Sequence, residues 1–529
     1  MATDMDGNVR AFGFSSEKSG YRAGFLIKNE SIWPRVFSVL IIVISVLIGL
    51  ALVIFPGRGG IGFGFGAVAL VFLFAFLVSG EDYGSLPYVC FVLAVLYVVS
   101  VILWPRYGSL PFNFLPVRNP RRALFILALG FSFCAVLLSS DARKQAIGLV
   151  NEAPAAFRVL AVYLLWRVFS LFGAVDFSSS LLSLTIELVG VFSAVFIWSI
   201  CLRDASLFSR LVRILVAVTV IGCLLVVVEG VKARNLYLDF LSIDPGESAY
   251  FSFLFDRVRD GVYRSQGAFE HPLLLTEYIV FILPISIALI FNERRVFYKF
   301  IWLISVLLLL VASYFVRSRS AFLFVGIVLV IGVFFVMLRI LINSRSLAKW
   351  FVPLALAIPF AVLVFVLAPY VVDVVSGGTF MERLSTATRL LMIERGLPVI
   401  LDNPIFGIGP GAAAHALGIY NSQGLPICDN YYLQIAMESG LPALLFFISF
   451  WFLVLPKALK FVLFGRPQEN LVLAFGVLVG VIGILVFKLI MAETQNFDFL
   501  FLGVIGLLVL QRDSLDVDPC ASRIGVKNA

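Results

Sequence analysis

Residues 298–342 read YKFIWLISVLLLLVASYFV, then RSRS, then AFLFVGIVLVIGVFFVMLRILI. Two apolar runs, at about 298–316 and 320–342, are thus separated only by the short turn Arg317–Ser320. A helix of about twenty apolar residues crosses the hydrocarbon core of a bilayer. The stretch therefore predicts two antiparallel transmembrane helices joined by a tight turn at the membrane surface.

The same pattern recurs along almost the whole chain. Of its 529 residues, 61% are hydrophobic and 14% are charged, whereas about a quarter of the residues of a soluble protein are charged. The short alternating segments of a membrane barrel are not visible. We expect further spans at about 33–55, 61–79, 86–104, 122–140, 180–202, 208–230, 273–292, 350–372, 440–463, 470–490 and 498–511.

The fold class predicted from these runs is an all-α polytopic membrane protein with thirteen or fourteen transmembrane helices. The count depends on the apolar segment 155–175, which contains Arg158 and Arg167 and either crosses the membrane or lies in its interface. No cleavable signal peptide is expected before the first span, because no short apolar core with a small-residue cleavage site is present.

Lysine and arginine in short loops mark the cytoplasmic side. The basic loops at 203–213, 294–299, 339–349 and 457–466 fall on one side by parity, so the segments between them face outward. The first third of the chain is ambiguous. Counting 155–175 as a span places the N-terminus inside but turns the group Arg118, Arg121 and Arg122 outward.

This parity divides the chain into five expected parts. They are a polar N-terminal tail at 1–32, transmembrane helices over 33–372 with an outward loop at 231–272, a large and partly helical outward loop at 373–439, three last transmembrane helices over 440–511, and a cytoplasmic tail at 512–529.

No metal or other cofactor is expected. The six cysteines form no CxxC pair, and two isolated histidines, His271 and His415, do not make a metal site. Three charges inside the spans, Glu187, Glu277 and Lys488, are costly in lipid and so predict ion pairs or functional groups. We expect Glu187 to pair with Arg158 or Arg167.

Two outward segments carry arginine. Arg264 opens a run to Pro272, and its planar guanidinium suits a phosphate or pyrophosphate. Taken alone, it is better explained by a pair with Asp256, Asp260 or Glu270. Arg319, in the turn between two spans, would bind either substrate or lipid headgroups.

The loop at 373–439 contains most of the remaining polar motifs. We expect a helix over about 381–400 that ends at Asp402-Asn403-Pro404, followed by a turn at Gly407, Gly409 and Gly411. Asp429-Asn430 predicts the start of a short helix that runs to about Glu438 and is broken by Gly440 and Pro442. The positive end of this helix would stabilise an anion.

In order along the chain, these segments resemble the O-antigen ligase and polymerase superfamily of bacterial membrane glycosyltransferases. The matching residues are Arg264-Ser265-Gln266-Gly267-Ala268-Phe269-Glu270-His271-Pro272, Ser318-Arg319-Ser320, Thr388-Arg389, Asn403-Pro404-Ile405-Phe406-Gly407-Ile408-Gly409, and Asp429-Asn430-Tyr431-Tyr432-Leu433-Gln434 to Glu438-Ser439-Gly440. They span roughly residues 229–510.

The resemblance implies a GT-C-like helical fold, an undecaprenyl-pyrophosphate-linked saccharide donor, a saccharide acceptor, and a site facing the periplasm from the bacterial inner membrane. It implies essential arginines at Arg264 and Arg389. Family ligases have a histidine where this chain has Asp429, which favours polymerisation of repeat units into exopolysaccharide, capsule or O-antigen over ligation to lipid A core or to protein.

We therefore assign catalysis to Arg264, Arg389 and Asp429. Glu438 and His415 remain alternatives to Asp429 as the base. Inversion at the sugar is expected, with a flippase and a chain-length regulator as partners and no nucleic acid. A transporter of lipid-linked saccharides is the alternative from another class, although transporters concentrate polar residues near the midplane. Substrate binding is assigned to Arg319, His271, His415, Asn430, Tyr432 and Glu438.

Overall fold

The computed structural model describes residues 85–109, 119–239, 241–243, 258–259, 261–343, 380–421, 424–465 and 469–516. The predicted spans 33–55, 61–79 and 350–372, and the N-terminal tail 1–32, lie outside these residues. The total of thirteen or fourteen spans therefore stays a prediction.

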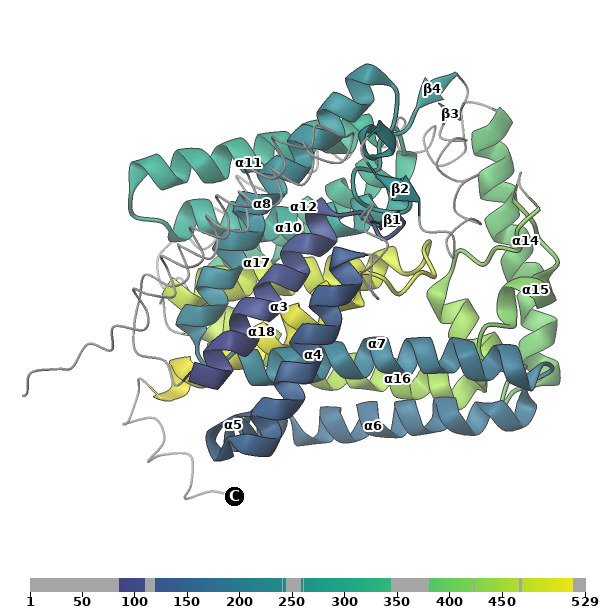
Figure 1. The fold of residues 1–529 in the computed structure, drawn as a ribbon, viewed down its shortest axis with the longest axis horizontal. Coiled ribbons are helices and arrows are strands. Elements are labelled where there is room, and N and C mark those ends of the chain that lie inside the picture. The colour runs from purple at the N-terminus through teal and green to yellow at the C-terminus, as the bar shows by residue number, and fades with distance from the viewer. Residues whose placement is uncertain are drawn as a thin grey trace, which may run out of the picture.

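The described residues confirm an all-α polytopic membrane protein, because nine of their helices are long and apolar enough to cross a bilayer. Strands occur there only as short pairs (Figure 1). The helices are α3 (Ser85–Leu103), α4 (Pro120–Leu138), α5 (Ser140–Glu152), α6 (Pro154–Phe169), α7 (Phe177–Cys201), α8 (Ala205–Lys232), α10 (Pro272–Asn292), α11 (Val296–Phe315), α12 (Arg319–Asn343), α14 (Phe380–Asp402), α15 (Ala413–Leu417), α16 (Tyr431–Phe464), α17 (Glu469–Phe487) and α18 (Phe497–Asp516).

The ambiguous segment 155–175 forms α6 and the 3-10 turn η1 (Ser170–Gly173), and together they are one of the nine candidate spans. A polar helix that the hydrophobicity pattern does not predict, α5, precedes it. The Gln145 side chain of α5 donates a hydrogen bond to the carbonyl of Ile200 at 3.0 Å, which attaches α5 to the end of α7.

Helix α10 lies at the centre of the bundle, with almost every side chain buried. Glycines on α17 allow its backbone to approach α10 closely. A Cβ placed on Gly480 would lie 2.5 Å from the carbonyl oxygen of Phe281, and one on Gly476 would lie 2.7 Å from that of Pro284. Small residues at such contacts are the usual means of packing helices tightly in lipid.

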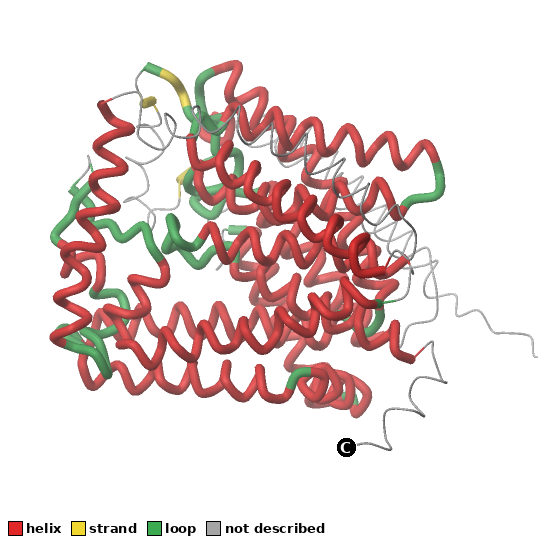
Figure 2. The backbone as a smooth tube through the Cα atoms, turned by 180° about the vertical axis from the view of Figure 1, so that it is seen from behind, coloured by secondary structure: helices red, strands yellow, loops and turns green. Residues whose placement is uncertain are grey.

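Most of the longer loops and both strand pairs gather at one end of the bundle, which we call the loop-rich end (Figure 2). There β1 (Gly108–Ser109) after α3 pairs with β2 (Ser242–Ile243) after α8, and Asn119 donates to the carbonyl of Gly108 at 2.9 Å. Pro120 and Lys232 therefore lie at the same end of the bundle. This agrees with the chain path, because α4, α6, α7 and α8 cross the bundle four times between these two residues. Arg121 and Arg122 therefore lie at the same end of the bundle as residues 264–272, which we call the Arg264 segment.

Candidate functional site

The Arg264 segment is held in place by Glu229, a buried carboxylate near the end of α8. No role is assigned to this residue from the sequence alone. Glu229 accepts hydrogen bonds from the Tyr263 hydroxyl at 2.8 Å and from the backbone amides of Gln266 and Gly267 at 3.3 and 2.8 Å. Gly267 has a φ of 59°, which suits glycine. A carboxylate in an otherwise apolar span was the available signal for this role.

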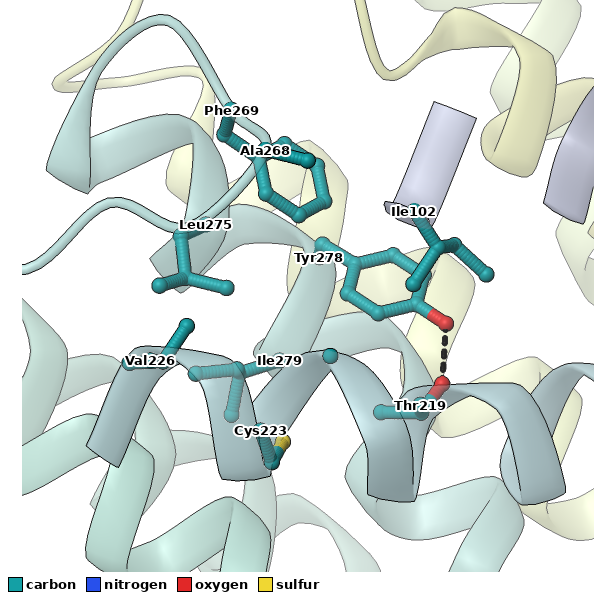
Figure 3. A pocket seen from close by; sticks show the side chains of 10 residues that line it. Ile102, Thr219, Cys223, Val226, Ala268, Phe269, Leu275, Tyr278 and Ile279 are labelled. Atoms are coloured by element: carbon teal, nitrogen blue, oxygen red, sulfur yellow. Dashed lines mark hydrogen bonds between the residues drawn. The ribbon is translucent and has the colours of Figure 1, made fainter. Parts of the chain in front are cut away.

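The rest of this segment anchors it in the core. Ala268 and Phe269 line a small, mostly apolar cavity, where the Phe269 ring lies 5.4 Å from the ring of Tyr278 and Tyr278 is hydrogen-bonded to Thr219 (Figure 3). The cavity walls offer almost no polar groups for a saccharide. The run from Gly267 to Phe269 is thus a packing element that fixes Arg264 at the surface.

Arg264 lies against the turn between α11 and α12. Its Nε donates to the carbonyl of Val316 at 3.4 Å, and the amide of Ser265 donates to the carbonyl of Phe315 at 3.0 Å. The structure therefore brings Arg264 beside the turn that contains Arg317 and leads into Arg319, the first residue of α12. Arg317, with a φ of 49°, places its guanidinium 3.9 Å from the centre of the Tyr314 ring.

His271 and Glu270 at the end of the segment make structural contacts. His271 is the N-cap of α10, and its Nδ1 accepts a hydrogen bond from the amide of Leu273 at 3.1 Å. Glu270 pairs with Arg106 at 3.5 Å and accepts a hydrogen bond from Gln495. Substrate binding by His271 thus stays a prediction, beside a capping role that the structure displays.

Arg389 and Asp429, predicted as catalytic residues, lie at the loop-rich end where α14 meets the start of α16. The amide of Asp429 donates to the sulfur of Met392, one helical turn beyond Arg389, at 3.4 Å. Partial burial raises the pKa of the Asp429 carboxyl, and the nearby Arg389 guanidinium lowers it by less. The Nε of Arg389 is buried and has no hydrogen-bond partner among the described residues. A guanidinium with an unused donor next to a carboxyl of raised pKa is the arrangement that phosphate binding and proton transfer need.

Asn430 and Tyr432 have defined structural contacts beside this pair. Asn430 is the predicted cap of α16, and its side chain accepts a hydrogen bond from the amide of Leu433 at 3.0 Å. The Tyr432 hydroxyl donates to the carbonyl of Leu485 at 2.7 Å. Both contacts fix the start of α16, and with it the position of Asp429.

The glycine-rich turn supports a break in α16. Gly440 is non-helical, with φ 77° and ψ 176°, so the carbonyls of Met437 and Glu438 lack their usual helical donors. The amides of Ile408 and Gly409 donate to these carbonyls at 2.9 and 3.0 Å. The turn at 407–411 therefore supplies hydrogen-bond donors to the free carbonyls of the broken helix. This agrees with the predicted turn, and the amides are not arranged as a phosphate-binding loop.

Glu438, two residues before this break, belongs to a buried cluster that we call the Arg167 cluster. The Arg167 guanidinium contacts Glu187 of α7 and Glu438 of α16, the latter at 3.1 Å, and donates to the Ser439 hydroxyl at 2.6 Å. Glu187 also accepts hydrogen bonds from two tyrosines, Tyr163 and Tyr431. The predicted pair of Glu187 with Arg167 is confirmed, and its alternative with Arg158 is not formed. The Glu438 side chain is 2% exposed.

The other two charges predicted in spans also pair. Lys488 Nζ lies 2.8 Å from Glu277 Oε1, with both side chains fully buried. The carbonyl of Lys488 accepts the amide hydrogen of Tyr431 at 2.9 Å, so this pair connects α10 and α17 to the start of α16.

The predicted site residues thus fall into two groups. Arg264 and the turn that contains Arg319 lie beside α8 and α11, whereas Arg389, Asp429, Asn430 and Tyr432 lie where α14 meets α16. The chain segments 244–257 and 344–379, which precede these groups, lie outside the described residues. His415, on α15, is exposed. Among the described residues, no cluster of three or more His, Cys, Asp or Glu could hold a metal ion.

Part of the chain matches a known family. Residues 303–448 match the family model described as O-antigen ligase, a range that includes Arg319, Arg389, Asp429 and the break at Gly440. The Arg264 segment precedes the matched range. No curated protein matches the chain.

Proposed function

Because the chain is a member of the O-antigen ligase/polymerase superfamily, with a role in cell-surface polysaccharide assembly, we propose that it is a glycosyltransferase that polymerises lipid-linked repeat units. The donor is an oligosaccharide on undecaprenyl pyrophosphate, and the acceptor is the growing saccharide. The reaction takes place at the loop-rich end, on the periplasmic face of the inner membrane, and needs no metal.

The observation that carries this proposal is the packing of Asp429 against α14 one turn from Arg389, where the guanidinium lowers the pKa of the Asp429 carboxyl. An acceptor hydroxyl attacks the anomeric carbon while the bond from that carbon to the diphosphate oxygen breaks. The hydroxyl proton passes to Asp429, and the diphosphate leaves with the bonding electron pair. Attack opposite the leaving group inverts the anomeric centre.

The arginines stabilise the charge that develops on the leaving diphosphate. Only interactions that strengthen in the transition state accelerate the reaction, and a bidentate guanidinium meets a diphosphate that is gaining charge more strongly than one still bonded to sugar. Arg389, whose Nε is without a hydrogen-bond partner in the part of the chain that the structure describes, supplies this interaction from α14. Arg264, held on the Glu229-anchored segment, supplies it from the other group of site residues.

The test compares Arg264→Ala and Arg389→Ala with Arg383→Ala, an exposed arginine on α14. Loss of a preorganised charge-stabilising donor lowers turnover by about 10²–10³-fold. In a strain that lacks the native gene, we expect the first two variants to lose long polymer and Arg383→Ala to keep it, at equal amounts in the membrane. Normal polymer in both site variants would refute the proposed chemistry.

Ligation is the second candidate, because the matching family model is described as O-antigen ligase. The purified enzyme distinguishes the two reactions. Given only the lipid-linked repeat unit and a chelator, a polymerase forms longer lipid-linked products. A ligase leaves this donor unchanged until a separate acceptor is added, and a metal-dependent enzyme is inactive with the chelator present.

A further inference from the structure

Helix α14 has an apolar face that no described part of the chain covers. Leu390, Ile393, Leu397 and Leu401 are 65, 50, 53 and 67% exposed, and their spacing of three and four residues places them on one side of the helix. We call these four side chains the α14 stripe. A contiguous exposed apolar surface of this kind marks a contact with a partner or a membrane.

The opposite side of α14 is the packed one. Met392 and Ile400 are buried, and a Cβ on Gly396 would lie 2.9 Å from the side chain of Leu433 in α16. Close packing on this side fixes the rotation of α14. The exposure of the stripe is therefore set by the fold.

The stripe continues into the lipid-facing surface of a spanning helix. Beyond Leu401 the exposed side chains of Ile405 and Phe406 follow, and the Phe406 ring stacks on Trp166 of α6, with centres 5.7 Å apart. Trp166 also donates to the carbonyl of Ile405 at 3.3 Å. Because α6 is a candidate span with a largely exposed surface, its exposed face meets lipid.

The direction of α14 also fits a membrane surface. Helices α6, α7 and α16 run side by side, and α14 stands across them at the loop-rich end (Figure 1). The stripe is bordered by charged and exposed residues, among them Glu394 and Asp402. An amphipathic helix that lies in the membrane plane buries its apolar side about 5–10 Å into the interface.

We propose that the α14 stripe is embedded in the lipid leaflet at the loop-rich end of the bundle. Its partner is the hydrocarbon beneath the headgroups, and the aromatic side chains of Trp166, Phe169 and Phe406 continue the contact at interfacial depth. The helix is therefore an interfacial element of the membrane domain and not part of a loop surrounded by water.

This contact has a consequence for Arg389 that rests on the proposed function. Arg389 directly precedes Leu390, and a helical step of about 100° per residue places it in line with the buried Gly396 and Ile400, on the packed side of α14. An embedded stripe keeps the Arg389 guanidinium at headgroup depth. There it meets the diphosphate of a membrane-anchored donor without the donor leaving the bilayer.

The depth of α14 is measured with spin labels in lipid nanodiscs of phosphatidylethanolamine and phosphatidylglycerol. All six native cysteines are replaced, and single cysteines are introduced as Leu397→Cys in the stripe and Asp402→Cys as the control on the same helix. We expect the label at 397 to be relaxed by oxygen, which concentrates in lipid, and the label at 402 by a water-soluble nickel chelate.

Two results would overturn the lipid contact. Equal exposure of both labels to the nickel chelate would place the stripe in water. Shielding of the 397 label from both reagents would show that protein covers it, either a second copy or another part of the chain.

The depth measurement does not require activity, so it separates this inference from the proposed reaction. For the consequence at Arg389, Ile393→Gln/Leu397→Gln is compared with Glu394→Gln. We expect a several-fold rise in KM for a long polyprenyl donor in vesicles with the double variant and none with the control. An unchanged KM with an embedded label would leave α14 in lipid but remove its role in presenting Arg389.

Discussion

At the residue scale, the pair formed by Arg389 and Asp429 combines two requirements of glycosyl transfer. A carboxyl of raised pKa holds a proton more readily than a solvated aspartate, which favours its use as a base. The Arg389 guanidinium opposes part of that rise, and its Nε has no hydrogen-bond partner within the described ranges of the chain. Proton acceptance and stabilisation of the leaving group can therefore occur at neighbouring side chains.

This pair predicts a definite pH dependence. The base is active when deprotonated, and because the pKa of Asp429 is raised, turnover should fall with decreasing pH above the range of an ordinary aspartate. Replacing Arg389 with Gln removes the charge that lowers this pKa, so the acidic limb should move to higher pH in whatever activity remains. Product formation by the purified enzymes, measured across pH, gives the acidic limb of the native protein and that of the Arg389→Gln variant.

The control for this prediction is Asp429→Asn, which keeps the size and loses the titration. It should reduce turnover by about 10²–10⁴-fold and leave no limb assignable to this position. An unchanged pH profile in Asp429→Asn would assign the base elsewhere, with His415 as the first alternative.

Some of these residues could be identified from local sequence alone. Asn430 as a cap and the pair of Glu187 with Arg167 follow from local chemistry, since a cap needs only its own helix and a charge in lipid needs a partner. The roles of Glu229 and Glu438 depend on partners far along the chain, and no spacing rule supplies those. Sequence alone assigns Glu438 to substrate binding or to the role of base, and in the structure it lies in the Arg167 cluster.

At the element scale, the break in α16 and the turn at 407–411 form one unit. The turn's amides replace the donors that the helix loses at Gly440, and the amide of Leu441 donates back to the carbonyl of Pro404 at 2.8 Å. The sequence predicts each half of this unit, because Gly440 with Pro442 predicts a break and three alternating glycines predict a turn. Their contact is a tertiary feature that neither pattern contains.

Gly440→Ala should destabilise the protein strongly. A Cβ at this position would lie 2.2 Å from the carbonyl oxygen of Ile405, and the φ of 77° disfavours any side chain. Overpacking typically costs about 1–3 kcal/mol, and the unfavourable backbone angle adds to that. The temperature at which the detergent-solubilised protein loses its monodisperse chromatographic peak measures the effect.

The matched control is Gly148→Ala in α5, where a new Cβ meets no atom of the described residues within 4 Å. An alanine in a helix interior is favoured over glycine by about 1 kcal/mol, so this variant should be neutral or slightly stabilised. Equal behaviour of the two variants would mean that the contact between the break and the turn contributes nothing to stability.

At the scale of the whole molecule, buried charges connect elements that are distant in the chain. The Arg167 cluster joins α6, α7 and α16, and the pair of Glu277 with Lys488 joins α10 to α17, whose last residues contact the start of α16. Both connections converge on the short helix 431–439 that follows Asp429. The fold class was predictable because hydrophobic length suffices for it, whereas this convergence depends on helix packing.

The Arg167 cluster predicts a non-additive response to mutation. Arg167→Met leaves Glu187 and Glu438 buried without a counter-charge, and breaking a buried pair in this way costs about 3–5 kcal/mol. Adding Glu187→Gln and Glu438→Gln removes both uncompensated charges, so the triple variant should recover most of the lost stability. Arg158→Met, on the exposed side of the same helix, is the control and should leave the unfolding temperature unchanged.

Activity separates the two roles of this cluster. If the cluster also positions the helix that follows Asp429, the triple variant should be stable yet form polymer slowly. Its neutral groups no longer connect α16 to one guanidinium, directly through Glu438 and indirectly through the bond from Tyr431 to Glu187. Unfolding temperature and polymer length, measured on the same preparations, give the two readouts. A triple variant that is both stable and fully active would limit the cluster to folding, and a stable Arg167→Met would show that these charges do not hold the three helices together.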